Sequence, residues 1–355
     1  MNRCALITGA AGLVGGYLIA ELLRRSLGAN SVGKIHCVVR GEASSLATTE
    51  GLLAMGCSSD AIAERVEYHI LDLESSVLVK ELVDRVRPDV VFHTAAKVDV
   101  GASSGSKAGE AIVRNNVLIT HILLETLLSL RQEGVDPLLV HVSSVAAFGT
   151  ADPRGVIDHM TPFVDIGAAS PYARSKFLSQ NDVLRAQKIG LRVVVVCPSV
   201  IVGLGRGGGA MERMLILASR GMQFYTRGAM GYVDVRDVAR AMVLLSLTPS
   251  AEGKIYCLNG ANVGFREFFT IFGAPFDRRA PRIGLDKWVV DCVGRLSLWW
   301  SFFTWQRPLL SLFVAKQLSE QVRYDGSAIE LSLPDFSYTP LSDTAQYVAE
   351  NLVKK

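Results

Sequence analysis

Short apolar runs alternate with longer segments of helical period in the first half of the chain. Six runs have the length of a buried strand, and they cover residues 4–8, 34–39, 66–71, 90–94, 138–142 and 191–197. Helical segments lie between them, up to about residue 26 and near 75–87 and 108–132. Alternating strands and helices predict a parallel sheet that is covered by helices on both faces. We therefore expect an α/β fold with a doubly wound parallel sheet.

A glycine-rich segment directly follows the first strand run, and its sequence is Thr8-Gly9-Ala10-Ala11-Gly12-Leu13-Val14-Gly15. Glycines let a backbone turn sharply and approach a pyrophosphate, which then rests on the N-terminus of the next helix. The position between a buried strand and an apolar helix supports this interpretation. The segment predicts a dinucleotide site at the first strand of a Rossmann-type sheet.

The second strand run ends in Arg40. An acidic residue at this position would bind a ribose 2′-hydroxyl, whereas an arginine would pair with a 2′-phosphate. Gly41 follows, and no Asp or Glu stands at the strand tip. This favours NADP(H), while NAD(H) stays open because Arg40 would also fit a solvated loop.

A serine and a proline predict the start of a helix near the middle of the chain. Ser170 is a good N-cap, and Pro171 suits the first helical position because its missing N–H needs no partner there. Tyr172 and Lys176 then lie one turn apart on one face. An ammonium favours a phenolate, so we expect Lys176 to lower the pKa of Tyr172 and prepare it for proton transfer. The simpler interpretation is a tyrosine packed under an aliphatic lysine stem.

Composition and charge narrow the classes of function. Of 355 residues, 49% are apolar and 20% are charged, and the net charge of +3 is too small to indicate nucleic-acid binding. Six cysteines form no C-x-x-C pair, and Thr8-Gly9 interrupts the apolar start, so we expect reduced thiols in a cytoplasmic protein. No apolar stretch reaches the roughly 18 uninterrupted residues of a membrane span.

The histidines of the strand runs give no metal signature. His36, His69 and His141 occupy similar strand positions, and we expect no metal site. His93, which also lies in a strand, is expected to be a core histidine with satisfied hydrogen bonds.

Seven sequence elements in register carry a resemblance to a known family. They are the glycine motif, Asp72, Ala95-Ala96, Asn116-Val117, Ser144, Tyr172-x-x-x-Lys176 and Pro198. In this order they resemble the extended short-chain dehydrogenase/reductases over nearly the whole chain. Ile119 replaces the glycine of the family's Asn-Val-x-Gly-Thr element.

The resemblance implies a role for each matched residue. Ser144 aligns with the family's catalytic serine or threonine and would hydrogen-bond the substrate oxygen. Tyr172 would transfer the proton, and Lys176 would hold the nicotinamide ribose and acidify Tyr172. The implied cofactor-binding residues are Gly9, Ala11, Gly12, Leu13, Val14, Gly15, Arg40, Asp72, Leu73, Ala95, Ala96, Lys97, Asn116, Ser143, Tyr172, Lys176, Pro198, Val200 and Ile201.

Departures from the family pattern point to a reductase branch. The family's dehydratases carry an acidic pair after the catalytic serine or threonine, whereas this chain has Val145-Ala146. Arg40 and the segment Cys-Pro-Ser-Val-Ile-Val-Gly at 197–203 look most like the aldehyde, dihydroflavonol and 3-beta-hydroxysteroid reductases. We expect a ketone or aldehyde reductase, or an alcohol dehydrogenase. The alternatives are an NAD-dependent sugar-nucleotide 4-epimerase and, in another class, a non-catalytic dinucleotide sensor.

The second half of the chain is expected to bind the substrate. All four tryptophans lie within 288–305, where an aromatic stretch at 296–305 is too short to span a bilayer. It fits core packing, an apolar roof over the substrate or a peripheral membrane contact. The glycine-rich segment 203–209 is expected to be a lid or an ordinary loop. Asp234 and Asp237 are expected to be helix N-cap and first-turn carboxylates.

The sequence suggests two domains and a small-molecule partner. We expect a dinucleotide-binding domain at 1–200, rejoined by about 230–258, and a smaller substrate domain from 201–229 and 259–355. The expected substrate is an apolar carbonyl or alcohol compound, with no nucleic acid. A homodimer stays open.

Overall fold

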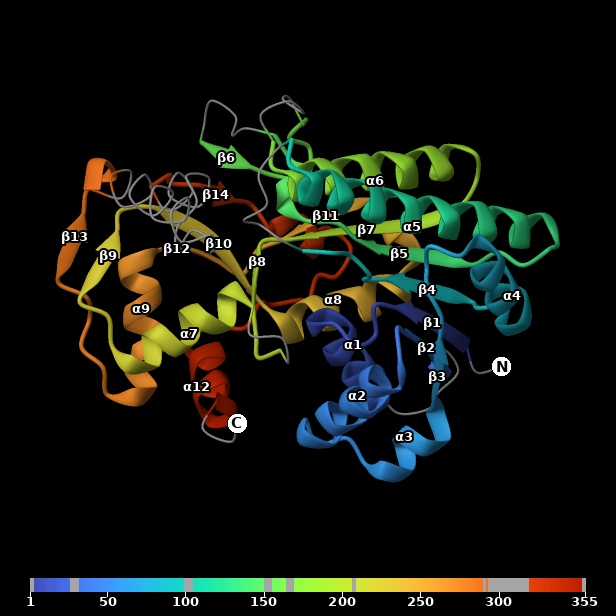
Figure 1. The fold of residues 1–355 in the computed structure, drawn as a ribbon, viewed down its shortest axis with the longest axis horizontal. Coiled ribbons are helices and arrows are strands. Elements are labelled where there is room, and N and C mark those ends of the chain that lie inside the picture. Colours follow the sequence, from blue (N-terminus) through green and yellow to red (C-terminus); the bar gives the residue numbers. More distant parts are fainter. Residues whose placement is uncertain are drawn as a thin grey trace.

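The computed structural model describes residues 3–25, 32–98, 105–149, 155–163, 169–205, 209–289, 292 and 319–352. Its centre is a sheet of seven parallel strands (Figure 1). In spatial order these are β11 (Ile255–Leu258), β7 (Arg192–Pro198), β5 (Leu138–Val142), β4 (Val90–His93), β1 (Arg3–Thr8), β2 (Val32–Val39) and β3 (Val66–Ile70). All six predicted strands are present, and β11 is added at one edge.

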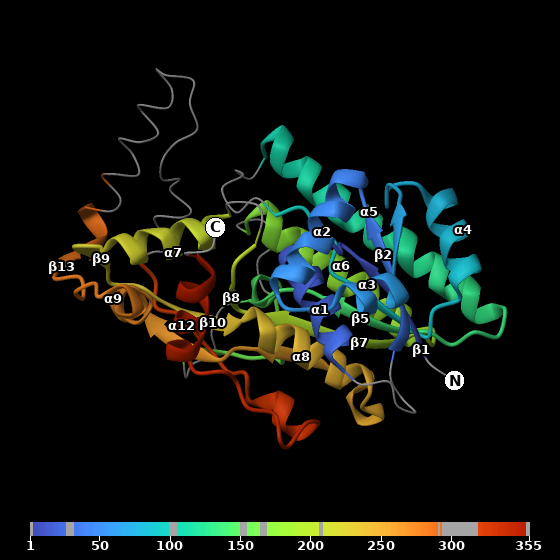
Figure 2. The same ribbon diagram turned by 90° about the horizontal axis from the view of Figure 1, so that it is seen from below.

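Helices cover both faces of this sheet, as expected. One face carries α1 (Leu13–Arg24), α2 (Glu42–Ala54), α3 (Ser59–Arg65) and α8 (Val235–Ser246). The other carries α4 (Ser76–Val86), α5 (Lys107–Gln132) and α6 (Pro171–Lys188). In Figure 1, α5 and α6 lie above the sheet and α1 and α8 below it, and Figure 2 shows the sheet from the side of α8. The prediction of a doubly wound sheet is confirmed.

The two hydrophobic cores follow from the alternation of side chains along each strand. Ile7 and Phe92 face α1 and α8, whereas their neighbours Leu6 and Val91 face α4 and α5. Successive residues of a strand point to opposite faces, and both faces are buried here. This explains why the strands are continuous apolar runs in the sequence.

Most of the remaining elements form a smaller region beside the main sheet. Its own core contains Tyr232, whose ring stacks on Phe268 with centroids 4.9 Å apart. The strands here are β6 (Val156–Ile157), β8 (Val200–Val202), β9 (Phe224–Thr226), β10 (Ala229–Asp234), β12 (Ala261–Gly264), β13 (Ile283–Leu285) and β14 (Arg323–Tyr324). The helices are α7 (Ala210–Arg220), α9 (Phe265–Gly273) and α12 (Leu341–Leu352). Short 3-10 turns are η1 (Val145–Ala147), η2 (Pro249–Ala251), η3 (Ala274–Phe276) and η4 (Ser327–Leu331). Of these elements, β6, η1, η2 and η4 also pack into the cores of the main sheet.

Several further expectations can be compared with the structure. Asp234 accepts a hydrogen bond from the Arg236 N–H and caps α8, and Asp237 lies in the first turn, as predicted. The six cysteines are free thiols, and Cys37 and Cys197 are among the four that are buried. The aromatic stretch 296–305 and residues 206–208 lie outside the described residues. The two-domain division stays a prediction.

Among the described helices, α5 is long and apolar enough to cross a membrane by length and composition. Of its most apolar window, 61% is buried inside the protein, where α5 packs against α6 and α4. Burial in the protein core accounts for the apolar composition of α5.

Candidate functional site

The glycine-rich turn after β1 packs its backbone closely against the loop after β4 and against itself. Gly9 has a φ of +74°, and a Cβ there would lie 2.7 Å from the Ala95 nitrogen. A Cβ on Gly15 would overlap the Gly9 carbonyl oxygen. Gly12 precedes α1 without a side-chain cap, so the first N–H groups of the helix stay available to an anion. These residues fit the pyrophosphate of a dinucleotide.

Gly9→Ala is expected to abolish most dinucleotide binding, because the new methyl group meets Ala95 and a positive φ disfavours any L side chain. Gly16→Ala is the matched control, since a Cβ on Gly16 meets nothing within 4 Å and the residue is helical. The control should bind normally and be stabilised by roughly 0.5–1 kcal/mol. Calorimetric titration and thermal unfolding check both. Equal binding by both variants would contradict the assignment of the turn.

The expected catalytic side chains come from the end of β5 and the start of α6. Ser170 caps α6, accepting a hydrogen bond from the Ala173 N–H at 3.1 Å, and Pro171 is the first helical residue, as predicted. This places Tyr172 in the first turn of the helix. Ser144 follows β5, where its Oγ accepts from the Ala146 N–H at 3.2 Å. Ser144 lies beside Tyr172, close enough for its hydroxyl to lower the pKa of the phenol.

Burial controls the protonation of Tyr172 and Lys176. It raises the pKa of Tyr172, against a smaller lowering by the neighbouring Ser144 hydroxyl. Burial also lowers the pKa of Lys176 to about 8, and its Nζ donates to the Val142 carbonyl at 2.8 Å. The expected lowering of the Tyr172 pKa by Lys176 is therefore wrong for the protein without cofactor, since the ammonium is directed at a strand carbonyl. The phenol therefore holds its proton at neutral pH.

Asn116 of α5 links the loop after β4 to the helix that carries Tyr172. Its Oδ1 accepts from the Lys97 N–H at 2.7 Å, and its Nδ2 donates to Ser175 Oγ at 3.0 Å. Ser175 Oγ donates in turn to the Tyr172 carbonyl oxygen at 2.8 Å. Ser175 was not among the residues predicted for the site, because its contact with Asn116 depends on the packing of α5 against α6. Asn116 therefore fixes α6 relative to the carboxyl end of β4.

His93 extends this network into the sheet. Its Nδ1 lies 2.7 Å from Thr8 Oγ1 and its Nε2 lies 3.1 Å from Thr120 Oγ1. Because Thr120 Oγ1 donates to the Asn116 carbonyl, it accepts from His93 Nε2–H, and Thr8 donates to Nδ1. Burial lowers the pKa of His93 to about 3. The prediction of a satisfied core histidine is confirmed.

The other residues expected at the cofactor site lie at or beyond the carboxyl ends of the strands. Asp72 follows β3 and is exposed, and its Oδ1 accepts from the Glu74 N–H at 3.0 Å. Arg40 is exposed at the end of β2. Ser143 follows β5 and is buried, and Pro198 ends β7. The residues Leu73, Ala95, Ala96, Val200 and Ile201 are half-buried, and Lys97 is exposed.

The segment after β8 passes close to the glycine-rich turn. A Cβ on Gly203 would overlap Val235 and lie 3.5 Å from Leu13 Cδ1, and one on Gly205 would lie 3.6 Å from the same atom. The first residues of the glycine-rich segment 203–209 therefore lie beside the turn between β1 and α1. Residues 206–208, which the lid interpretation needs, are not described.

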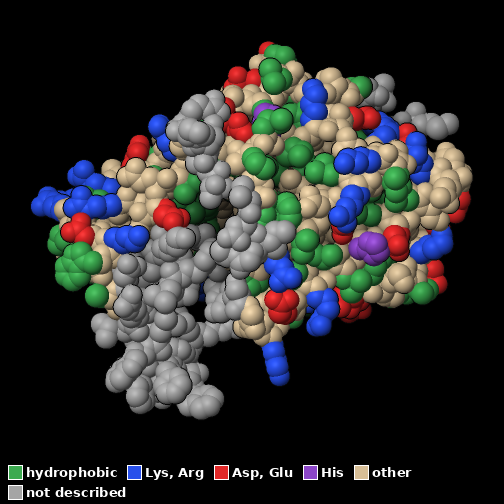
Figure 3. All heavy atoms as spheres, turned by 90° about the horizontal axis from the view of Figure 1, so that it is seen from above, with side chains coloured by type: hydrophobic (Ala, Val, Ile, Leu, Met, Phe, Trp, Pro, Cys, Tyr) green, Lys and Arg blue, Asp and Glu red, His purple; other side chains and the backbone are tan. Residues whose placement is uncertain are grey.

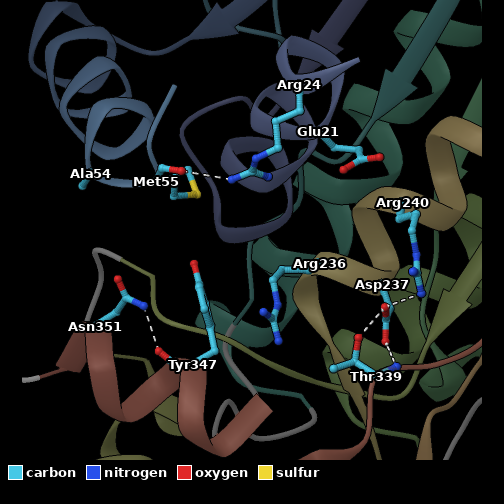
Figure 4. Close-up of a pocket in the computed structure, with 10 residues that line it drawn as sticks. All are labelled: Glu21, Arg24, Ala54, Met55, Arg236, Asp237, Arg240, Thr339, Tyr347 and Asn351. Atoms are coloured by element: carbon cyan, nitrogen blue, oxygen red, sulfur yellow. Dashed lines mark hydrogen bonds and ion pairs between the residues drawn. The ribbon is translucent and has the colours of Figure 1, made fainter. Parts of the chain in front are cut away.

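A cavity of about 410 Å³ lies elsewhere, between α1, α2, α8 and α12 (Figure 4). Ser144, Tyr172 and Lys176 do not line it. Of its cations, Arg240 pairs with Asp237 at 2.7 Å, and Arg24 donates to the Met55 carbonyl at 3.1 Å. Arg236 likewise pairs with Asp234 at 2.6 Å, so two of the three arginines that line the cavity have a carboxylate partner. The candidate catalytic residues lie at the carboxyl ends of the strands and not in this cavity.

Two strand histidines lie beside a carboxylate in an arrangement that could hold a metal ion, although no metal site was expected from the sequence. His36 Nδ1 lies 2.9 Å from His69 Nε2, and both lie 3.6 Å from Glu67 oxygens. Arg85 Nη2 is 3.3 Å from His69 Nδ1 and can only donate, so His69 Nε2 carries the hydrogen shared with His36. Burial lowers the pKa of both imidazoles. The geometry favours a neutral hydrogen-bonded pair over metal ligands.

Comparisons with known proteins agree with this geometry. The chain is 25% identical over 326 residues to the sterol demethylase protein B of Methylococcus capsulatus, covering 91% of this chain and 90% of that protein. It is 26% identical over 357 residues to a protein of Synechocystis assigned as a dihydroflavonol 4-reductase, covering 95% and 92%. It is 27% identical over 295 residues to a UDP-glucose 4-epimerase of Mycolicibacterium smegmatis, covering 79% and 86%.

A solved structure shows the same fold. The terminal R domain of the myxalamid PKS-NRPS biosynthetic pathway has a TM-score of 0.75 at 21% identity, covering 99% of this chain and 91% of that one. The model of the NAD dependent epimerase/dehydratase family matches residues 5–258. The protein therefore belongs to this family, whose members are NAD(P)-dependent enzymes of the extended short-chain dehydrogenase/reductase type.

Proposed function

We propose that the protein is an NADP(H)-dependent oxidoreductase that interconverts a hydrophobic ketone or aldehyde and its alcohol. The observation that carries this proposal is the placement of Ser144 beside Tyr172, which is protonated, with Lys176 one turn further along the same helix and bonded to the end of β5. A pure dinucleotide sensor has no need of a positioned phenol.

The nicotinamide supplies or accepts the hydride when it is bound. Ser144 Oγ binds the substrate oxygen and polarises the carbonyl. Tyr172 Oη gives its proton to that oxygen during reduction and takes it back during oxidation. Lys176 is proposed to hold the ribose, while Asn116 and Ser175 keep the first turn of α6 in place. Gly9, Ala11, Gly12, Leu13, Val14 and Gly15 are proposed to hold the pyrophosphate, and Asp72, Leu73, Ala95, Ala96, Lys97, Asn116, Ser143, Pro198, Val200 and Ile201 the rest of the cofactor.

The residues after Ser144 argue against a dehydratase. Val145 and Ala146 begin η1, and Val145 is buried in the core beneath α6. No carboxylate therefore stands next to Ser144 in the chain to remove or return a proton. This leaves reduction, oxidation and epimerisation as the reactions that the site supports.

A hydrophobic substrate is supported by the relatives and by the sequence. Two relatives are named for a sterol and for a dihydroflavonol, which are both largely apolar. The aromatic stretch 296–305 supplies apolar side chains to the part of the chain expected to bind the substrate. A sugar nucleotide would instead require charged ligands for its diphosphate.

NADPH is expected to bind more tightly than NADH by about 10–150-fold, and Arg40→Ala should erase most of the difference. Arg40 is exposed at the end of β2, directly before the uncapped N-terminus of α2. A guanidinium pairs with the 2′-phosphate in bidentate fashion, and a hydrogen bond to a charged group contributes roughly 1.5–3 kcal/mol. The carboxylate of Glu42 in the first turn of α2 repels a 2′-phosphate, so we expect a preference near the lower end of the roughly 10–150-fold range.

Titration of both cofactors by calorimetry measures this preference. Arg185→Ala serves as the control, since Arg185 lies on the exposed side of α6 with 80% of its side chain accessible. Equal affinities in the unmodified protein, or tighter NADH binding, would mean that Arg40 points into solvent, and the epimerase alternative would gain.

Turnover separates the three functions. The proposed reductase consumes NADPH with at least one of a panel of apolar aldehydes and ketones. A sensor binds NADPH and consumes none with any panel member. A 4-epimerase, which the UDP-glucose 4-epimerase relative keeps as the second candidate, interconverts UDP-sugars without net cofactor consumption.

A further inference from the structure

The far end of the smaller region exposes large apolar side chains on a two-stranded sheet. Phe224 of β9 and Ile283 of β13 are direct partners across this parallel pair. Phe224 is 47% exposed and Ile283 is 48% exposed. Trp288, five residues beyond Ile283, is 68% exposed. Soluble surfaces carry scattered apolar side chains, but here two large ones are paired on one small sheet and a third follows within five residues.

Cations surround this patch. The exposed basic residues in and around the two strands are Arg220, Arg227, Arg278, Arg279, Arg282 and Lys287. Figure 3 shows Lys and Arg side chains gathered at the end of the molecule where β9 and β13 lie. Asp286 pairs with Arg227 at 2.9 Å, and Asp277 is the other nearby exposed aspartate. The cations therefore outnumber the acidic side chains here, although the whole chain has a net charge of only +3.

We propose that this surface, formed by β9, β13 and Trp288 and named here the β9–β13 tip, binds the surface of an anionic lipid bilayer. Aromatic and aliphatic side chains enter the boundary between headgroups and acyl chains, while arginine and lysine attract anionic headgroups. Both parts are needed, because either alone gives weak binding. An acidic protein would match the charges but would leave the exposed Trp288, Phe224 and Ile283 without an apolar counterpart.

The tip belongs to the part of the chain that is expected to bind the substrate. An apolar substrate partitions into a bilayer, so docking through this end would bring the substrate-binding region to the membrane that holds the substrate. The membrane contact considered from the sequence was the stretch 296–305, whereas the tip consists of described residues that precede it. The proposal stands independently of the reaction, since vesicle binding is measured without turnover.

Co-sedimentation of the full chain with vesicles tests the proposal. Vesicles of phosphatidylcholine alone are compared with vesicles that also contain phosphatidylserine. We expect binding to the anionic vesicles only, weakened by added salt because exposed charges are screened. Each surface cation contributes about fivefold to the affinity, so Arg279→Gln with Arg282→Gln should weaken binding about 25-fold.

A second variant tests the apolar half. Phe224→Ser with Ile283→Ser should reduce anionic vesicle binding at least as strongly as the charge variant. The matched controls are Arg185→Gln, with a side chain 80% exposed on α6, and Leu331→Ser, which is 82% exposed in η4. Both controls should bind vesicles normally. Because all the substituted side chains are exposed, unchanged NADPH affinity and thermal unfolding verify that each variant is folded.

Vesicle binding that is the same in the tip variants and in the controls would overturn the proposal and place the contact elsewhere. Binding to a DNA duplex or an acidic peptide without binding to anionic vesicles would also overturn it. A variant that lost NADPH affinity and turnover but still bound vesicles would affect the proposed function and not the β9–β13 tip, because the vesicle assay measures binding without turnover.

Discussion

Tyr172→Phe is expected to lower turnover by about 10²–10⁴-fold while dinucleotide affinity stays unchanged, because the substitution keeps the ring and removes the transferable proton. The phenol carries the proton at neutral pH in this site, since burial raises its pKa. The loss should appear in kcat more than in KM, because proton transfer belongs to the transition state.

A second tyrosine provides the control for this substitution. Tyr17 in α1 hydrogen-bonds Tyr347 at 3.1 Å, on the face of the sheet opposite α6. Tyr17→Phe should keep full turnover. Near-full turnover of Tyr172→Phe under conditions where hydride transfer is rate-limiting would show that another group supplies the proton.

Lys176→Met is expected to remove most turnover and to weaken cofactor binding, yet to stabilise the protein without cofactor by about 1–2 kcal/mol. Lys176 is buried, and among the described residues no carboxylate pairs with it; burial lowers its pKa to about 8. Each pKa unit corresponds to about 1.4 kcal/mol, part of which is offset by losing the hydrogen bond to Val142. Lys188→Met, at the exposed end of the same helix, should change neither property.

The same pKa shift gives a pH dependence with a definite sign. Between about 8 and the ordinary value of 10.5, the unfolded chain keeps a proton on Lys176 that the folded chain has released. The free energy of unfolding therefore gains from this residue as pH rises through that window. The stability advantage of Lys176→Met should be largest below pH 8 and shrink above it. An advantage that stays constant across this range in denaturant unfolding would show that Lys176 is not a buried cation.

Much of the fold could be predicted because both faces of the sheet are buried. Buried parallel strands must be continuous apolar runs, so β1, β4 and β5 were visible to within about two residues. Ser170 and Pro171 predicted the start of α6, because the preferences for an N-cap and a first helical residue depend on the local sequence alone. The small strands β6, β9 and β13 were missed, because two or three residues carry no periodicity.

The candidate site was harder to predict wherever packing between distant parts of the chain determines which side chains meet. The spacing of Tyr172 and Lys176 places them on one helix face, but it cannot show that Lys176 Nζ is directed at the Val142 carbonyl. The link from Asn116 to Ser175 spans two helices and has no local signal. The meeting of His36 and His69 likewise depends on the register of β2 against β3, which a single sequence does not reveal.

The central claim is net transfer between cofactor and substrate, and isotope labelling measures it most directly. The protein is incubated with NADPH deuterated at the transferable position and with an apolar carbonyl compound from the panel that it consumes. Mass spectrometry then follows the label in the alcohol. The account predicts a deuterated alcohol formed in step with NADP⁺, and loss of this product in Tyr172→Phe. Deuterium that remains on the cofactor while UDP-sugars interconvert would contradict the account and establish an epimerase.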